Sequence, residues 1–172
     1  EPLVSGDAAV VPVRYTSDRV GMGVVEGFLV VAGRREAAGL LVVGSASLFA
    51  ESGAGADEAV AAGLLEGFTA SWNADDAAGV LGNMTEDAAV WANVAYADSI
   101  GSTADLEMTL AAAFSVSMEA TGPPVLAGPF IAAPLLGTDQ GTGEALGAIA
   151  ILWVREGKIA LLAVAMGEPS GE

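Results

Sequence analysis

Four apolar, strand-length segments follow one another in the C-terminal half of the sequence, and they restrict the possible folds more than any other feature. Their bounds are 115–120, 125–136, 145–154 and 159–166. Short turns rich in glycine, proline and polar residues separate them. This succession predicts an antiparallel meander, and a sheet of this kind needs other elements to cover one of its faces.

Three helices are predicted before these strands. The first carries an apolar residue at every fourth position: Val60, Leu64, Phe68 and Trp72. Residues 77–84 predict a second, shorter helix, and 88–93 a short strand. A third helix follows Ser102, where Asp105 three residues later resembles a capping box. We therefore expect an α+β domain with the helices packed on a curved antiparallel sheet.

The formal charge of −16 is unevenly distributed. Residues 1–50 carry five acids and four bases, whereas 51–172 carry 17 acids and only two bases, Arg155 and Lys158. The change falls at a Gly-rich stretch, which we interpret as a domain boundary. The expected parts are a β segment at 1–50, a linker at 51–55, the main domain at 56–168 and a tail at 169–172.

The residue types that are missing exclude several kinds of chemistry. The chain has no Cys and no His, so it has no disulfide, no Cys or His zinc site and no histidine base. Its negative charge argues against binding to nucleic acid or anionic membranes. The carboxylates form no compact metal pattern, and we expect neither a metal nor another cofactor. No apolar run is long enough for a membrane helix, so we expect a soluble protein, cytoplasmic or exported.

Two motifs carry a resemblance to a known superfamily. Residues 67–78 read GFTASWNADDAA and residues 84–91 read MTEDAAVW, with GST at 101–103 and VREGKI at 154–159. In this order they resemble the polyketide-cyclase-like (SnoaL-like), ketosteroid-isomerase-like and nuclear-transport-factor-like proteins over residues 56–168. The resemblance implies a cone-shaped domain of three helices and a curved sheet that enclose a pocket.

Residues 1–50 are expected to form a three-stranded antiparallel segment. Val10–Ser45 can be aligned without a gap to Ile131–Met166, at an offset of 121. Both segments then show the same order of apolar segments, a polar loop and a turn that begins with Arg. The segment is either the closing strands of a related module or an unrelated β-meander. Its apolar face should pack on the main domain or on a second chain. We expect a homo-oligomer, most simply a dimer through the sheet.

The resemblance also indicates where catalytic carboxylates would lie. Isomerase-like members place one acid at the end of the strand that follows the second helix, where this chain has Trp91-Ala92-Asn93. They place another in the penultimate strand, which is wholly apolar at 148–153. The usual catalytic set is therefore missing. The remaining candidates are Asp98 as a base and Tyr96 beside it, although both residues are also typical of an ordinary polar turn.

The candidate ligand-binding residues are mostly large and apolar. They are Phe68, Trp72, Trp91, Asn93, Met118 and Trp153. The alternative is that the apolar members are only core residues. These residues predict a protein that binds a small apolar molecule, with cyclase or isomerase activity left open. The other hypothesis is a non-catalytic interaction or self-assembly module that uses the sheet face and the N-terminal strands.

Overall fold

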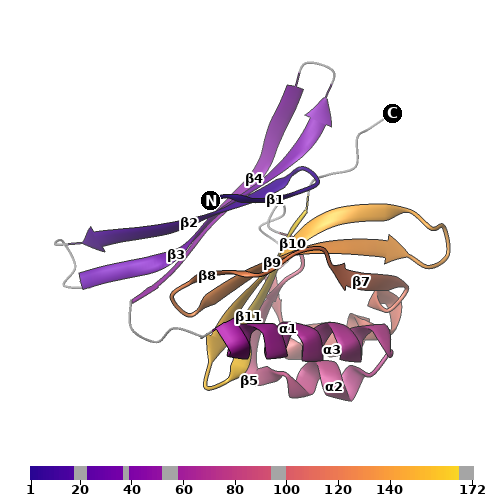
Figure 1. The fold of residues 1–172 in the computed structure, drawn as a ribbon. Helices are drawn as coiled ribbons and strands as arrows, with labels where there is room; N and C mark the ends of the chain where they lie inside the picture. The colour runs from indigo at the N-terminus through magenta and orange to yellow at the C-terminus, as the bar shows by residue number, and fades with distance from the viewer. Residues whose placement is uncertain (18–22, 37–38, 52–57, 94–99, 167–172) are drawn as a thin grey trace.

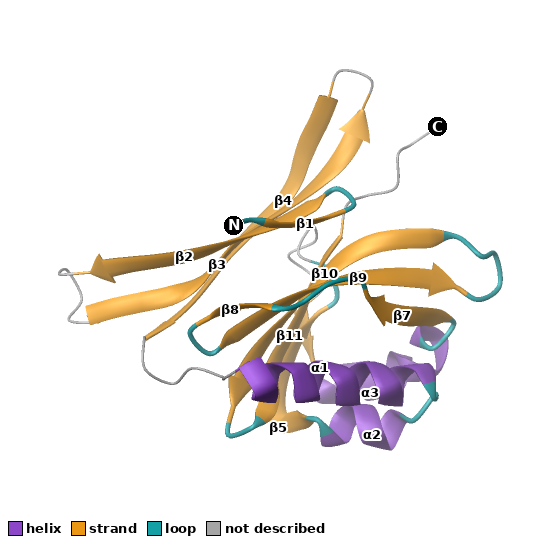
Figure 2. Cartoon of the chain, viewed as in Figure 1, coloured by secondary structure: helices purple, strands orange, loops and turns teal. Residues whose placement is uncertain are grey.

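The computed structural model describes residues 1–17, 23–36, 39–51, 58–93 and 100–166 (Figure 2). The N-terminal strands are β1 (Leu3–Ser5), β2 (Ala8–Ser17), β3 (Gly23–Glu36) and β4 (Gly39–Glu51). The helices are α1 (Glu58–Asn73), α2 (Ala77–Gly82) and α3 (Thr103–Ala113). The other strands are β5 (Met84–Trp91), β6 (Ile100–Ser102), β7 (Val116–Ala120), β8 (Val125–Ala127), β9 (Phe130–Asp139), β10 (Ala145–Arg155) and β11 (Lys158–Met166).

The main sheet has seven strands, and the helices lie together on one side of it (Figure 1). Its order is β6-β5-β11-β10-β9-β7, with β8 paired to β9. Phe68 and Trp72 of α1 and Leu110 of α3 form a buried core with Ile131 and Leu152 of the sheet. The α+β class is therefore confirmed. The sheet is mixed rather than wholly antiparallel, because β11 pairs in parallel with β5.

The N-terminal strands form a separate sheet in the order β1-β2-β3-β4, which packs on the other face of the main sheet. Their contact is an apolar core in which Val10, Phe28 and Val30 meet Ala132, Ile149 and Ile151. The turn between β1 and β2 approaches β10 so closely that a Cβ at Gly147 would lie 2.8 Å from the Gly6 nitrogen. This sheet has four strands where three were expected, because the three-residue β1 is too short to recognise from the sequence.

Strands β1–β4 and β8–β11 share one arrangement. Each set begins with a three-residue strand and a two-residue turn led by a glycine with positive φ, +55° at Gly6 and +60° at Gly128. Glycine adopts this conformation without the steric cost that a Cβ would add. The β-bulges fall at Ala32/Gly33 and at Trp153/Val154, which is the offset of 121 found in the sequence, whereas the two glycines are 122 residues apart. A common origin of the two sets stays a prediction.

Two predicted strand boundaries were wrong. The segment at 125–136 is not one strand but the β8–β9 hairpin, because Gly128 turns the chain back before Pro129. The strand predicted at 88–93 begins earlier, at Met84, and ends at Trp91. Its early residues are irregular: Met84 lies opposite Ile159, whereas Ala89 lies opposite Leu161. This bulge interrupts the period-two burial by which a strand is recognised.

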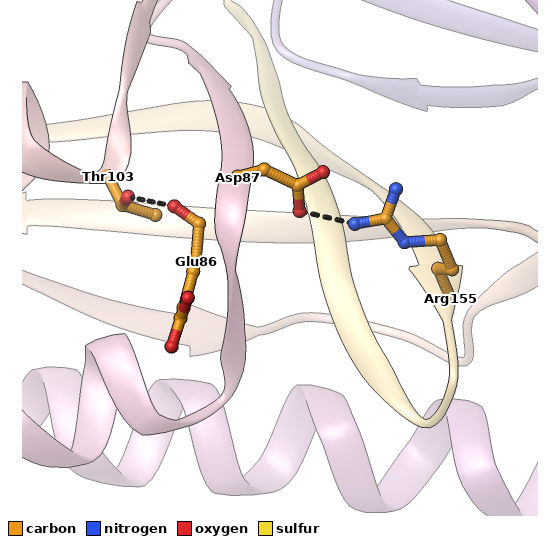
Figure 3. A network of polar contacts seen from close by, with 4 residues as sticks. All are labelled: Glu86, Asp87, Thr103 and Arg155. Atoms are coloured by element: carbon orange, nitrogen blue, oxygen red, sulfur yellow. Dashed lines mark hydrogen bonds and ion pairs between the residues drawn. The ribbon is translucent and has the colours of Figure 1, made fainter.

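Polar contacts fix the ends of several elements. The predicted capping box is confirmed, because Asp105 Oδ2 accepts a hydrogen bond from the Ser102 N–H (2.7 Å) and Ser102 Oγ accepts one from the Asp105 N–H (3.3 Å). Figure 3 shows Thr103 donating to the Glu86 carbonyl (3.0 Å) and the ion pair of Arg155 with Asp87. These contacts join α3 and the β10–β11 hairpin to β5. None of the described helices is long and apolar enough to cross a membrane.

Candidate ligand-binding site

A cavity of about 750 Å³ lies between the helices and the main sheet. Side chains from α1 and α3 form one wall, and β5, β7, β9, β10 and β11 form the other. The lining is predominantly apolar, with small residues such as Ala148 and Ala150 on β10 leaving the space open. Thr109 contributes a hydroxyl that donates to helix carbonyls of α3, those of Asp105 and Leu106. The volume is in the range of pockets that hold small molecules.

Trp72 is the best-fixed aromatic residue of the cavity wall. Its indole N–H donates to the Val116 carbonyl of β7 at 2.8 Å. Its ring centroid lies 5.8 Å from that of Phe68 and 5.5 Å from that of Phe114, the latter in an edge-to-face arrangement. Aromatic contacts and a satisfied N–H hold such a side chain in one orientation. The wall is therefore preformed rather than assembled around a ligand.

Asn73 joins the end of α1 to β7. Its side-chain amide donates to the Met118 carbonyl (2.7 Å), and its side-chain oxygen accepts from the Met118 N–H (2.8 Å). Strand β7 is at the edge of the main sheet and lacks a neighbouring strand on one side. The Asn73 amide supplies two of the hydrogen bonds that such a strand would make. The contact fixes the end of α1 against β7, and both elements contribute residues to the cavity lining.

The sequence-predicted ligand residues separate into two groups. Phe68, Trp72 and Met118 line the cavity. Trp91 and Trp153 instead pack against the core between the two sheets, where the Trp153 and Phe130 ring centroids are 6.2 Å apart.

Of the three polar candidates, the structure describes only Asn93. Asn93 is buried and does not belong to the cavity lining. Asp98 and Tyr96 lie outside the described residues. A ligand or catalytic role for any of the eight predicted residues stays a prediction.

Two carboxylates at the rim of the cavity were not singled out from the sequence. Asp139 ends β9 and Glu144 directly precedes β10, and the Asp139 N–H donates to the Glu144 carbonyl at 2.9 Å. Asp139 Oδ1 accepts from the Gly141 N–H (2.9 Å), the Thr142 N–H (2.7 Å) and the Thr142 hydroxyl (3.1 Å). These hydrogen bonds, chiefly those from Thr142, hold the pKa of Asp139 below its usual range, so it is ionised at neutral pH.

The arrangement of charges suits binding better than acid–base chemistry. A carboxylate base needs a pKa raised toward the working pH, and the Asp139 pKa is shifted the other way. The deeper lining residues of β10 are alanines. Among the described residues, no three Asp or Glu side chains gather closely enough to hold a metal ion.

Comparison with solved structures relates this architecture to known proteins. AclR, a proposed hydroxylase from Streptomyces galilaeus, superposes with a TM-score of 0.52 at 18% identity, over 64% of this chain and 76% of that one. A proposed ketosteroid isomerase from Kribbella flavida gives 0.56 at 16% identity, over 67% and 84%. An NTF2-like protein of unknown function from Cytophaga hutchinsonii gives 0.52 at 10% identity, over 62% and 88%. The chain has an NTF2-like fold.

The NTF2-like fold is the fold that the resemblance of residues 56–168 implied. No family model matches the sequence, and a search of curated proteins found no match. At these identities the likeness concerns the fold, since one fold carries many functions. The function must be argued from the cavity itself.

Proposed function

We propose that the chain binds a small apolar molecule in the cavity between α1, α3 and the main sheet of a cone-shaped domain. The observation that carries this proposal is the roughly 750 Å³ of space lined mainly by apolar side chains. Burying apolar surface contributes about 25 cal/mol per Å², so a ligand that fills such a site is held mainly by the hydrophobic effect. Catalysis by Asp98 and Tyr96 is no part of the proposal, because both lie outside the described residues.

A substitution that fills the cavity tests the proposal. Ala148→Phe places a ring in the space that the ligand would use, and we expect the affinity for a neutral apolar dye such as Nile red to fall at least about tenfold. The measurement is a fluorescence titration, with circular dichroism to verify that the variant is folded.

Ala111→Phe is the matched control for this experiment. Ala111 is exposed on α3 and does not belong to the cavity lining, so the same added ring should leave the affinity unchanged. A folded Ala148→Phe variant that binds the dye as well as the unmodified protein contradicts the proposal.

A second candidate function is self-association, and one observation favours it. Three exposed apolar side chains, Val4 (65%), Leu29 (41%) and Val42 (57%), belong to the N-terminal sheet. The strand register places all three on the face opposite Phe28, because Val4 pairs with Ala9, Ala9 with Val31, and Val42 with Gly33. Since β1–β4 cover the helix-free face of the main sheet, this outer face is the sheet surface available to a second copy.

Leu29→Lys is expected to shift a dimer of this kind toward monomer. The lysine would place a charge in the centre of the apolar contact, where its desolvation is costly. Sedimentation velocity across a concentration series measures the effect, with Met108→Lys as the control because Met108 is 77% exposed on α3. If the unmodified chain is monomeric at every concentration, this second candidate is wrong.

A further inference from the structure

The cavity has an uneven distribution of charge along its length. Its deeper part is apolar, formed by residues such as Phe68, Trp72 and Ala150. Two ionisable side chains are found among the described lining residues, Asp139 and Glu144; both are acidic, and both belong to the rim. Among the described residues that line the cavity there is no lysine and no arginine.

The nearest bases in the main domain's sequence lie far from this rim. Arg155 ends β10 and Lys158 begins β11, whereas Glu144 precedes the opposite end of β10. An 11-residue strand spans about 35 Å, several times the screening length of charges in physiological salt. Arg155 is also paired with Asp87. Neither base can balance a negative charge placed at the rim.

The β9–β10 hairpin holds the two rim carboxylates side by side. Asp139 and Glu144 are cross-strand neighbours, joined by the hydrogen bond from the Asp139 N–H to the Glu144 carbonyl. Cross-strand neighbours have Cβ atoms about 5 Å apart, so one ligand group can interact with both carboxylates. The three hydrogen bonds to the Asp139 carboxylate all use Oδ1, and none of them uses Oδ2. A cation at the rim would relieve the repulsion between these carboxylates.

We propose that the ligand of this cavity is an apolar molecule with a cationic amine at one end, its apolar part between α1 and the sheet and its amine at Asp139 and Glu144. This inference rests on the proposed function and specifies the chemical class of the ligand. It excludes fatty acids and other apolar anions as preferred ligands, because an anionic end group at the same place would face two like charges, and the described lining residues include no base to balance it.

Three probes with the same alkyl chain separate these possibilities: decylamine, decan-1-ol and decanoate. At pH 7.5 the first is a cation, the second neutral and the third an anion. Titration calorimetry with the full chain measures the three affinities. We expect decylamine to bind about tenfold more tightly than decanoate, with decanol between them, and the difference to narrow as salt is added.

Charge-neutral variants locate the effect. Glu144→Gln should reduce the preference for decylamine over decanoate about threefold, because it removes one rim charge. Glu119→Gln is the matched control: Glu119 is exposed on β7, next to the cavity residue Met118 on the strand, so its side chain alternates away from the cavity. If Glu119→Gln changes the preference as much as Glu144→Gln, the amine is held by overall charge and the inference is overturned.

The remaining outcomes distinguish this inference from the proposed function. If decanoate binds as tightly as decylamine, and Ala148→Phe weakens both, the cavity binds apolar molecules without a preference for amines, and only the inference fails. If none of the three probes binds, and Nile red does not bind either, the proposed function itself fails.

Discussion

Replacing Phe28 by alanine is expected to lower the free energy of unfolding by about 3–5 kcal/mol. Phe28 is fully buried in the core between the two sheets, where it packs with Val30, Ile149 and Ile151. Removing its ring takes away buried apolar surface and leaves a cavity that two facing sheets cannot easily close. Urea denaturation followed by far-ultraviolet circular dichroism measures the change.

The control for this prediction is Met108→Ala. Met108 is largely exposed on α3, so its truncation should change the free energy of unfolding by less than about 0.5 kcal/mol. The pair tests whether residues 1–51 are an integral part of the folded unit. If Phe28→Ala costs as little as Met108→Ala, the N-terminal sheet does not contribute to the stability of the main domain.

The second large effect is expected at Trp72, whose replacement by alanine should cost about 3–5 kcal/mol. The change removes the ring that lies between Phe68 and Phe114 and leaves the Val116 carbonyl without the indole N–H that it accepts from. Trp72→Phe keeps most of the apolar surface and loses only the hydrogen bond, so its cost should be about 1–2 kcal/mol. Denaturation in urea measures both.

The same position distinguishes the two groups of aromatic residues. Because Trp72 lines the cavity and Trp153 packs on the other face of the sheet, only Trp72→Phe should weaken binding of Nile red. Trp153→Phe is the matched variant, with the same chemical change in the core between the sheets. Equal effects of the two variants on the dye's dissociation constant would show that Trp72 does not contact the ligand.

The order of helices and strands in the main domain could be predicted because it depends on periodicity and local signals. The repeat from Leu64 through Phe68 to Trp72 marks a buried helix face, and all three side chains are buried. Val60 belongs to the same four-residue spacing but is exposed. A helix turns every 3.6 residues, so a strict spacing of four drifts around the helix and Ala61 takes the buried position instead.

The composition of the cavity wall could be predicted only in part. Alternation along β10 places Trp153 with Ile149 and Ile151, and Ala148 with Ala150, but it does not say which group faces the helices. Bulky side chains normally indicate the buried face, and here both faces are buried, because β1–β4 cover one of them. The larger residues belong to the contact between the sheets, and the smaller residues leave room for the cavity.

The rim of the cavity was missed for a different reason. Asp139 and Glu144 belong to a polar turn, and a turn of this composition is ordinary on any protein surface. Their importance comes from the position of the β9–β10 hairpin relative to α1 and α3, which only the tertiary structure provides. Asn73 is a similar case, since its partner Met118 is 45 residues away along the chain.

The parallel pairing of β11 with β5 makes the main sheet depend on strands that are far apart in the sequence. Strand β11 lies between β10 and β5, and it also contacts β3 of the N-terminal sheet. Until residues 158–166 leave the ribosome, β5 lacks its parallel neighbour and the core between the sheets is incomplete. Pairings between distant segments give a high contact order and slow folding. Until β11 has emerged, the apolar faces of β5 and β10 stay exposed, and exposed strands of this kind favour aggregation.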